Sequence, residues 1–169
     1  MKKNLTLTGM MGVGKSTIGR ALSKRLLMRF SDVDKMIENS LNMSIQRIFE
    51  QKGELFFRKF EEKITIQEIN KKNTVISLGG GAFMNPKIRK NIFINSKSFW
   101  LDLDTKLIEK RLIKSKKRPL LNNKNLKKNL EKIYNDRKDT YARATYKINC
   151  NKLTVNLITN KIIKLYEND

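Results

Sequence analysis

One stretch near the start of the chain limits the possible folds more than any other. Residues 9–16 read Gly-Met-Met-Gly-Val-Gly-Lys-Ser and match the pattern G-x-x-x-x-G-K-[ST] at every fixed position. Apolar residues 5–8 before it indicate a strand, and residues 16–27 after it indicate a helix. A glycine-rich turn that matches by chance is the alternative, but this strand–loop–helix setting is the one in which backbone N–H groups wrap phosphates. The sequence therefore predicts a P-loop.

Each side chain of this loop has an expected task. Lys15 can reach the β- and γ-phosphates of a nucleotide, and the Ser16 hydroxyl can ligate Mg²⁺. The residues expected to hold the nucleotide are Gly12, Val13, Gly14, Lys15, Ser16 and Thr17.

Beyond the loop, strand patterns alternate with helix patterns. Strands are expected at 30–33, 74–78, 98–103 and 146–149, and helices at 35–41, from Ser44, 54–70, from Pro86, 104–113, 126–143 and 154–166. This alternation predicts an α/β three-layer sandwich with a central, mainly parallel sheet. No repeat, linker or shift of composition divides the chain, so residues 1–169 are expected to form one domain.

Two further polar motifs follow expected strands, where ligands bind in parallel sheets. Asp32 and Asp34 are two residues apart, so their side chains share a face of an extended chain. Near a P-loop, one carboxylate can hold Mg²⁺ through water and the other can accept a proton from a substrate hydroxyl. A helix cap beside a solvated aspartate is the alternative. Gly79, Gly80 and Gly81 indicate close approach of the backbone to a ligand, or else a plain loop.

The composition has a strong bias toward positive charge. Lys and Arg number 37 against 16 Asp and Glu, which gives a net charge of +21. Such a charge can indicate a nucleic-acid partner. However, 27 Lys, 18 Asn and 18 Ile together make 63 of the 169 residues, and the codons of all three are AT-rich. Because the cations are scattered over every expected helix, base bias of the genome is the simpler explanation, and we expect no nucleic-acid partner.

Other functional classes are excluded by what the chain lacks. It has no histidine and only Cys150, which excludes Cys/His zinc sites and internal disulfides and favours a reducing cytosol. No run of about 18 apolar residues is present, so no membrane span is expected.

Arginine is scarce in this lysine-rich chain, which draws attention to a few positions. Arg58, Arg111, Arg118 and Arg137 lie near ends of expected elements or in a polar stretch. Planar guanidinium groups suit carboxylates and phosphates better than lysine does, although any single one can be a surface charge. The polar segment at about 112–125, which contains Arg118, is expected to be a mobile lid that brings this arginine over the phosphates.

Taken together, these motifs resemble the shikimate kinase family. The matching stretches are 9–17, Phe-Ser-Asp-Val-Asp at 30–34, Gly-Glu-Leu-Phe-Phe-Arg at 53–58 with Glu61, the glycines at 79–81, Arg-Pro-Leu-Leu at 118–121, and Arg137 with Tyr141. They stand in the family's order and cover residues 5 to about 146. The P-loop is shared by many families, whereas the combination is specific.

The resemblance implies a nucleoside-monophosphate-kinase-like fold and transfer of the ATP γ-phosphoryl group to the 3-hydroxyl of shikimate. It implies that Arg58 and Arg137 hold the substrate carboxylate, with Glu61 orienting Arg58. It further implies that Asp34 and the backbone at 79–81 bind the ring hydroxyls and that Asp34 is the base. The resemblance assigns the remaining roles to Lys15 and Arg118 (transition-state charge), Ser16 and Asp32 (Mg²⁺), and Arg111 (adenine).

Two alternatives stay open at this point. A related kinase for gluconate or a nucleoside monophosphate would use the same P-loop but other residues in place of Arg58 and the three glycines. A basic, nucleotide-dependent nucleic-acid binder would need clustered cations and exposed aromatic side chains. The resemblance implies shikimate and ATP as the small-molecule partners. We further expect no membrane and no obligate protein partner, so the expected state is a cytoplasmic monomer.

Overall fold

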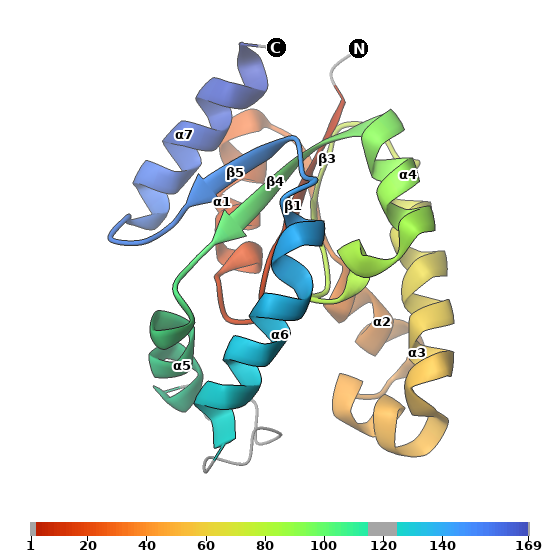
Figure 1. Cartoon of the computed structure of the whole chain (residues 1–169). Coiled ribbons are helices and arrows are strands. Elements are labelled where there is room, and N and C mark those ends of the chain that lie inside the picture. Colours follow the sequence, from red (N-terminus) through yellow and green to blue (C-terminus); the bar gives the residue numbers. More distant parts are fainter. Residues whose placement is uncertain (1–2, 115–124, 169) are drawn as a thin grey trace.

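The computed structural model describes residues 3–114 and 125–168. Its sheet contains five parallel strands: β1 (Asn4–Thr8), β2 (Arg29–Asp32), β3 (Thr74–Ser77), β4 (Ser96–Asp102) and β5 (Tyr146–Asn149). Their order is β2-β3-β1-β4-β5, which places β1 at the centre. The carboxyl ends of all five strands therefore meet at one edge of the sheet, the lower edge in Figure 1.

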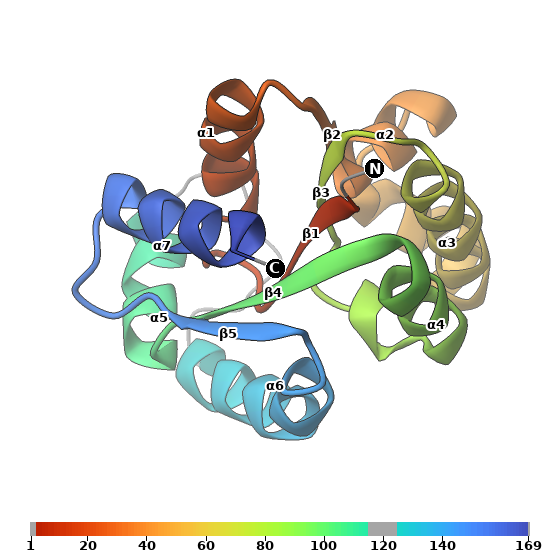
Figure 2. The same cartoon turned by 90° about the horizontal axis from the view of Figure 1, so that it is seen from above.

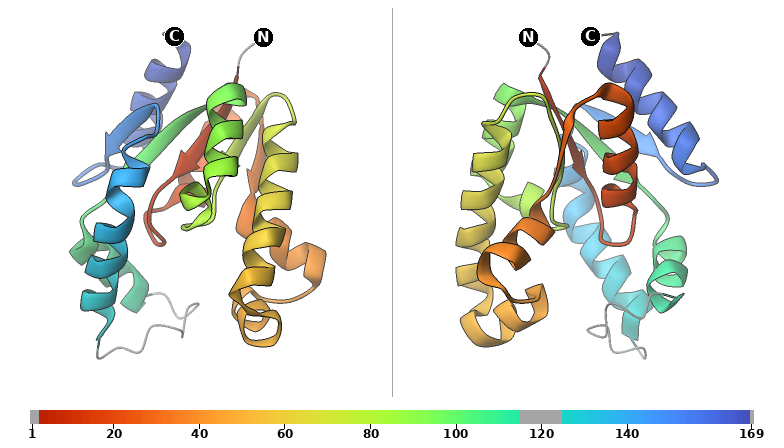
Figure 3. Two further views of the ribbon diagram at one scale, coloured as in Figure 1. Left: turned by 45° about the vertical axis from the view of Figure 1, so that its right-hand side comes forward. Right: turned by 180° about the vertical axis from the view of Figure 1, so that it is seen from behind.

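Helices cover both faces of this sheet. They are α1 (Lys15–Leu26), α2 (Val33–Leu41), α3 (Ile45–Ile69), α4 (Pro86–Asn95), α5 (Thr105–Lys114), α6 (Leu126–Tyr141) and α7 (Val155–Glu167), with a short 3₁₀ turn, η1 (Ala82–Met84). Seen from above, α1 and α7 lie on one side of the strands, and α3, α4 and α6 lie on the other (Figure 2). The rear view in Figure 3 shows α1 and α7 side by side. The expected three-layer α/β sandwich is confirmed.

Parallel strands with helices on both faces need apolar side chains on both sides. In β1 every residue is buried, and the apolar members Leu5 and Leu7 are fully inaccessible. The same pattern holds in β3, where Val75 and Ile76 are fully buried. Core packing therefore comes from side chains of sheet and helices together. None of the described helices meets the length and hydropathy that a membrane crossing requires.

Several element boundaries differ from the expected ones, for local reasons. The helices expected from Ser44 and over 54–70 form one element, α3, which is interrupted at Gly53 by non-helical backbone (φ 78°, ψ 167°). Helix α1 ends at Leu26 because Leu27 adopts the left-handed conformation of a C-cap. Strand β4 starts two residues early, since Ser96 pairs with Asn4 of β1.

Asn4 links β1, α3 and β3 at the edge of the sheet where the strands begin, opposite their carboxyl ends. Its side-chain amide donates to the carbonyl oxygens of Ile69 (2.8 Å) and Lys71 (2.5 Å), and its Oδ1 accepts from the Thr74 amide (3.0 Å). The side chain is buried, so these bonds do not compete with water. Asn4 thereby fixes the end of α3 and the start of β3 against β1.

Replacing Asn4 by alanine should lower the free energy of unfolding by about 3 kcal/mol, because this buried side chain loses three hydrogen bonds. Urea denaturation measures this loss. Asn91→Ala is the control: Asn91 is half-buried and donates to the Lys87 carbonyl through a hydrogen bond that is exposed to water, so its loss should cost about 0.5 kcal/mol or less. Equal losses in the two variants would contradict the assigned role of Asn4.

Candidate active site

The loop between β1 and α1 has backbone conformations that only glycine adopts easily. Gly9, Gly12 and Gly14 have φ values of 136°, 77° and 101°. At Gly9 a Cβ atom would lie 2.5 Å from the carbonyl oxygen of Leu101, so the loop also needs glycine for close packing on β4. Lys15 is the first residue of α1, and its ammonium group donates to the carbonyl oxygens of Gly9 (2.8 Å) and Met10 (2.9 Å). The expected strand–loop–helix context is confirmed.

A cavity of about 220 Å³ opens over this loop. The elements that line it are the P-loop, the start of α1, the end of β2 and the segment after β3. Its lining residues are Met11, Gly12, Gly14, Lys15, Ser16, Thr17, Asp32, Asp34, Ser77, Leu78 and Gly80. The structure thus brings together the three motifs that the sequence places after three different strands.

The two aspartates occupy different positions on α2. Asp32 ends β2 and is the N-cap of α2, where its side chain accepts from the Lys35 amide (3.3 Å). Asp34 lies in the first turn of α2. The helix cap that the sequence left open as an alternative is therefore present at Asp32. Both aspartates nevertheless line the cavity, so capping and ligand binding are compatible.

The glycine run after β3 makes room for charged side chains. At Gly79 a Cβ atom would lie 2.6 Å from Oε1 of Glu61 and 2.7 Å from Oδ1 of Asp34. At Gly81 it would lie 2.7 Å from Nη1 of Arg58. Because these positions lack side chains, the carboxylates and the guanidinium group can pack directly against the backbone of the loop.

Arg58 is held by two carboxylates of its own helix. Its Nη1 donates to Glu61 Oε2 (2.8 Å), and its Nε donates to Glu54 Oε1 (3.3 Å). Burial lowers the pKa of Arg58, but the charge and hydrogen bond of Glu61 outweigh this effect, so the pKa is raised. Burial raises the pKa of Glu61, and the opposing charge of Arg58 reduces that shift. Glu61 is 2% exposed and the Arg58 side chain is 35% exposed, so water is excluded from the carboxylate side of this ion pair.

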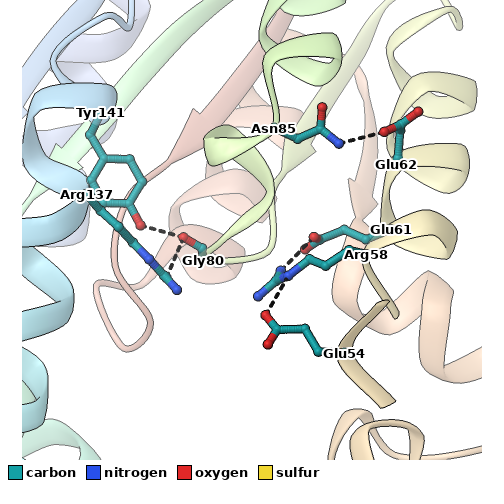
Figure 4. A network of polar contacts seen from close by, with 8 residues as sticks. All are labelled: Glu54, Arg58, Glu61, Glu62, Gly80, Asn85, Arg137 and Tyr141. Carbon is teal, nitrogen blue, oxygen red and sulfur yellow. Dashed lines mark hydrogen bonds and ion pairs between the residues drawn. The ribbon is translucent and has the colours of Figure 1, made fainter. Parts of the chain in front are cut away.

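Arg137 reaches the same loop from the opposite side. It lies on α6, and its Nη1 donates to the Gly80 carbonyl oxygen (3.0 Å). Figure 4 shows the guanidinium groups of Arg58 and Arg137 directed toward a shared space beside Gly80. Two guanidinium groups that converge in this way suit a carboxylate or another anion.

Of the four arginines singled out in the sequence, Arg111 is part of the described structure and Arg118 is not. Arg111, on α5, donates to the carbonyl oxygens of Val13 (3.0 Å) and Gly12 (3.4 Å) and so lies against the P-loop. Arg118 lies outside the described residues, together with most of the expected lid at 112–125.

Sequence reasoning missed two contacts. Glu54 stands four residues before Arg58, a helical spacing for ion pairs that was available as a signal. The Tyr141 hydroxyl donates to the Gly80 carbonyl oxygen, a contact between distant segments that no spacing reveals. Burial raises the pKa of the Cys150 thiol to about 11, so this thiol stays protonated at neutral pH.

Comparison with known proteins agrees with this geometry. The family model described as shikimate kinase matches residues 11–167. A shikimate kinase of Sulfurihydrogenibium sp. is 38% identical over 161 residues, 95% of this chain and 96% of the relative. One from Bacillus subtilis is 37% identical over 167 residues, 96% of this chain and 88% of the relative.

A solved structure extends the likeness to three dimensions. Shikimate kinase from Acinetobacter baumannii in complex with shikimate has a TM-score of 0.93 and 31% identity, over 99% of this chain and 94% of that one. The match covers the P-loop, the sheet and the helices that carry both arginines. The chain belongs to the shikimate kinase family.

Proposed function

We propose that the chain transfers the γ-phosphoryl group of ATP to the 3-hydroxyl of shikimate, giving shikimate 3-phosphate and ADP. The observation that carries this proposal is the convergence of Arg58 and Arg137 beside the glycine loop, next to the P-loop cavity. Shikimate has one carboxylate and three ring hydroxyls. Paired guanidinium groups suit the carboxylate, and the adjoining Asp34 and glycine backbone suit hydroxyls.

In this proposal Asp34 is the base. The 3-hydroxyl oxygen forms a bond to the γ-phosphorus, its proton passes to the Asp34 carboxylate, and the bond between the γ-phosphorus and the β,γ-bridging oxygen breaks to release ADP. Gly79 permits this placement, since its missing Cβ leaves space directly beside the carboxylate. The transfer needs little covalent chemistry from the protein, so positioning and charge dominate.

The P-loop side neutralises charge. Lys15 carries a positive charge at the floor of the cavity, and its bonds to Gly9 and Met10 hold the ammonium group beside the loop. Backbone amides at Gly12, Val13 and Gly14 and the side chains of Ser16 and Thr17 are the proposed nucleotide contacts, with Arg111 against the adenine. Arg118 would add charge over the phosphates, with 112–125 as a lid on a single catalytic domain.

Mg²⁺ is the metal that this donor set fits. Ser16 and Asp32 both present oxygen atoms to the cavity, and oxygen ligands suit this cation. In the described part of the chain no three His, Cys, Asp or Glu side chains cluster, so phosphate and water would complete the coordination. When bound, Mg²⁺ neutralises phosphate charge. We further propose that the enzyme works as a cytoplasmic monomer without nucleic acid.

The direct test is release of ADP from Mg²⁺-ATP with shikimate, gluconate and nucleoside monophosphates as acceptors. Release with shikimate alone is expected, and chelation of Mg²⁺ with EDTA should stop it. Release with another acceptor alone would keep the P-loop kinase and discard the two-arginine pocket. No release, together with DNA or RNA retention at physiological salt, would favour the basic nucleic-acid binder.

Asp34→Asn should lower kcat by about 100-fold or more, because the amide cannot accept the proton. ATP affinity, measured by titration calorimetry, should stay within about twofold of the unaltered enzyme. A variant that keeps a tenth of its turnover would show that Asp34 is not the base.

Arg58→Ala should raise the KM for shikimate by about 100-fold with little change in the KM for ATP, since one of two carboxylate donors is lost. Arg25→Ala is the matched control, because Arg25 is an exposed arginine bonded to Asn160. Steady-state kinetics with each substrate varied in turn measures both constants. A parallel rise of both KM values in Arg58→Ala would count against the pocket.

A further inference from the structure

The carbonyl oxygen of Gly80 accepts two hydrogen bonds from one helix. Arg137 donates through Nη1 at 3.0 Å, and Tyr141 donates through its hydroxyl at 2.5 Å. A carbonyl oxygen has two lone pairs, so this acceptor is saturated. Both donors lie on α6, one helical turn apart, and both appear beside Gly80 in Figure 4.

Arg137 has a second proposed role in substrate binding, whereas Tyr141 has none. In the proposed function, which this inference depends on, Arg137 binds the substrate carboxylate. An ionised carboxylate is a stronger acceptor than a backbone carbonyl, so substrate binding draws the Arg137 guanidinium toward it. Gly80 then depends on its second donor to stay in place.

The Tyr141 side chain is held rigidly enough to keep its hydrogen bond to the Gly80 carbonyl oxygen when Arg137 leaves. Its side chain is fully buried, and its ring stacks on Trp100 with centroids 5.9 Å apart and an interplanar angle of 28°. Trp100 is itself 3% exposed, and the Lys147 ammonium lies 4.4 Å from its ring centroid. Burial raises the pKa of Tyr141, so its hydroxyl stays protonated and able to donate at neutral pH.

Gly80 also lies against the P-loop. A Cβ atom at Gly80 would lie 3.4 Å from the backbone nitrogen of Met11 in the P-loop, so the two loops are in contact. Beyond η1, Asn85 donates to Glu62 Oε2 (2.7 Å) and fixes the next part of the segment to α3 (Figure 4). The glycine run is thus held beyond η1 by Asn85 and at Gly80 by α6.

We propose that Tyr141 is a positioning residue, which keeps Gly80 in its binding geometry while Arg137 moves from the Gly80 carbonyl to the acidic group of the substrate. Tyr141 acts through Gly80 and does not itself contact the substrate. Its loss should weaken shikimate binding more than it affects nucleotide binding or the stability of the fold.

The test compares Tyr141→Phe with Tyr134→Phe. Tyr134 is also on α6, and its hydroxyl donates to Asp102 Oδ1 (3.1 Å), away from the glycine run. Each substitution removes one hydroxyl and one hydrogen bond while keeping the ring, so both should lower Tm to a similar, small extent. KM for shikimate, KM for ATP, kcat and Tm are measured for both variants and the unaltered enzyme.

We expect Tyr141→Phe to raise the KM for shikimate about tenfold, with the KM for ATP within about twofold, and Tyr134→Phe to change neither. Equal kinetics in the two variants would overturn the inference, as would a Tyr141→Phe variant whose two KM values rise together with a much lower Tm. An unaltered enzyme with no shikimate-dependent turnover would overturn the proposed function itself, and the inference with it.

Discussion

The site depends on the parallel pairing of β1 between β3 and β4. Because both neighbours run in the same direction as β1, the loops that follow β1 and β3 leave the sheet at the same edge. The amide of Leu78 still donates to Leu7 (3.1 Å) just beyond the β3 strand, so the pairing continues to the start of the glycine run. Reversing β3 relative to β1 would separate the glycine run from the P-loop by the length of a strand.

A second constraint is electrostatic. Glu61 and Asp34 both approach Gly79, and like charges in a poorly solvated place repel one another. Arg58 and Arg137 offset that repulsion from two different helices. The charges around Gly79 therefore oppose one another in sign, and the protonation of Glu61 depends on Asp34, Arg58 and Arg137 together.

The sequence predicted what is local and what has fixed spacing. The P-loop and the helix that starts after Ser44 follow from residue types at set positions, and both are found. The α/β class follows from alternation. The order of the strands does not, because pairing partners depend on packing between segments that are distant in the chain.

The site was predictable in outline only. Residues after strands were expected to gather, and Asp34 and the glycine run do so. By contrast, the contact of Arg111 with Val13 and the shared carbonyl of Gly80 are set by angles and distances in the folded chain. Roles for Arg111 and Arg118 stay predictions.

Trp100 has a consequence for how this protein can be observed. It is the one tryptophan of the chain, so indole emission comes from a single place. Its ring stacks on Tyr141 and lies near Gly9, the residue that opens the P-loop. The intrinsic fluorescence of Trp100 therefore reports on the region between the P-loop and the glycine run, without any added label.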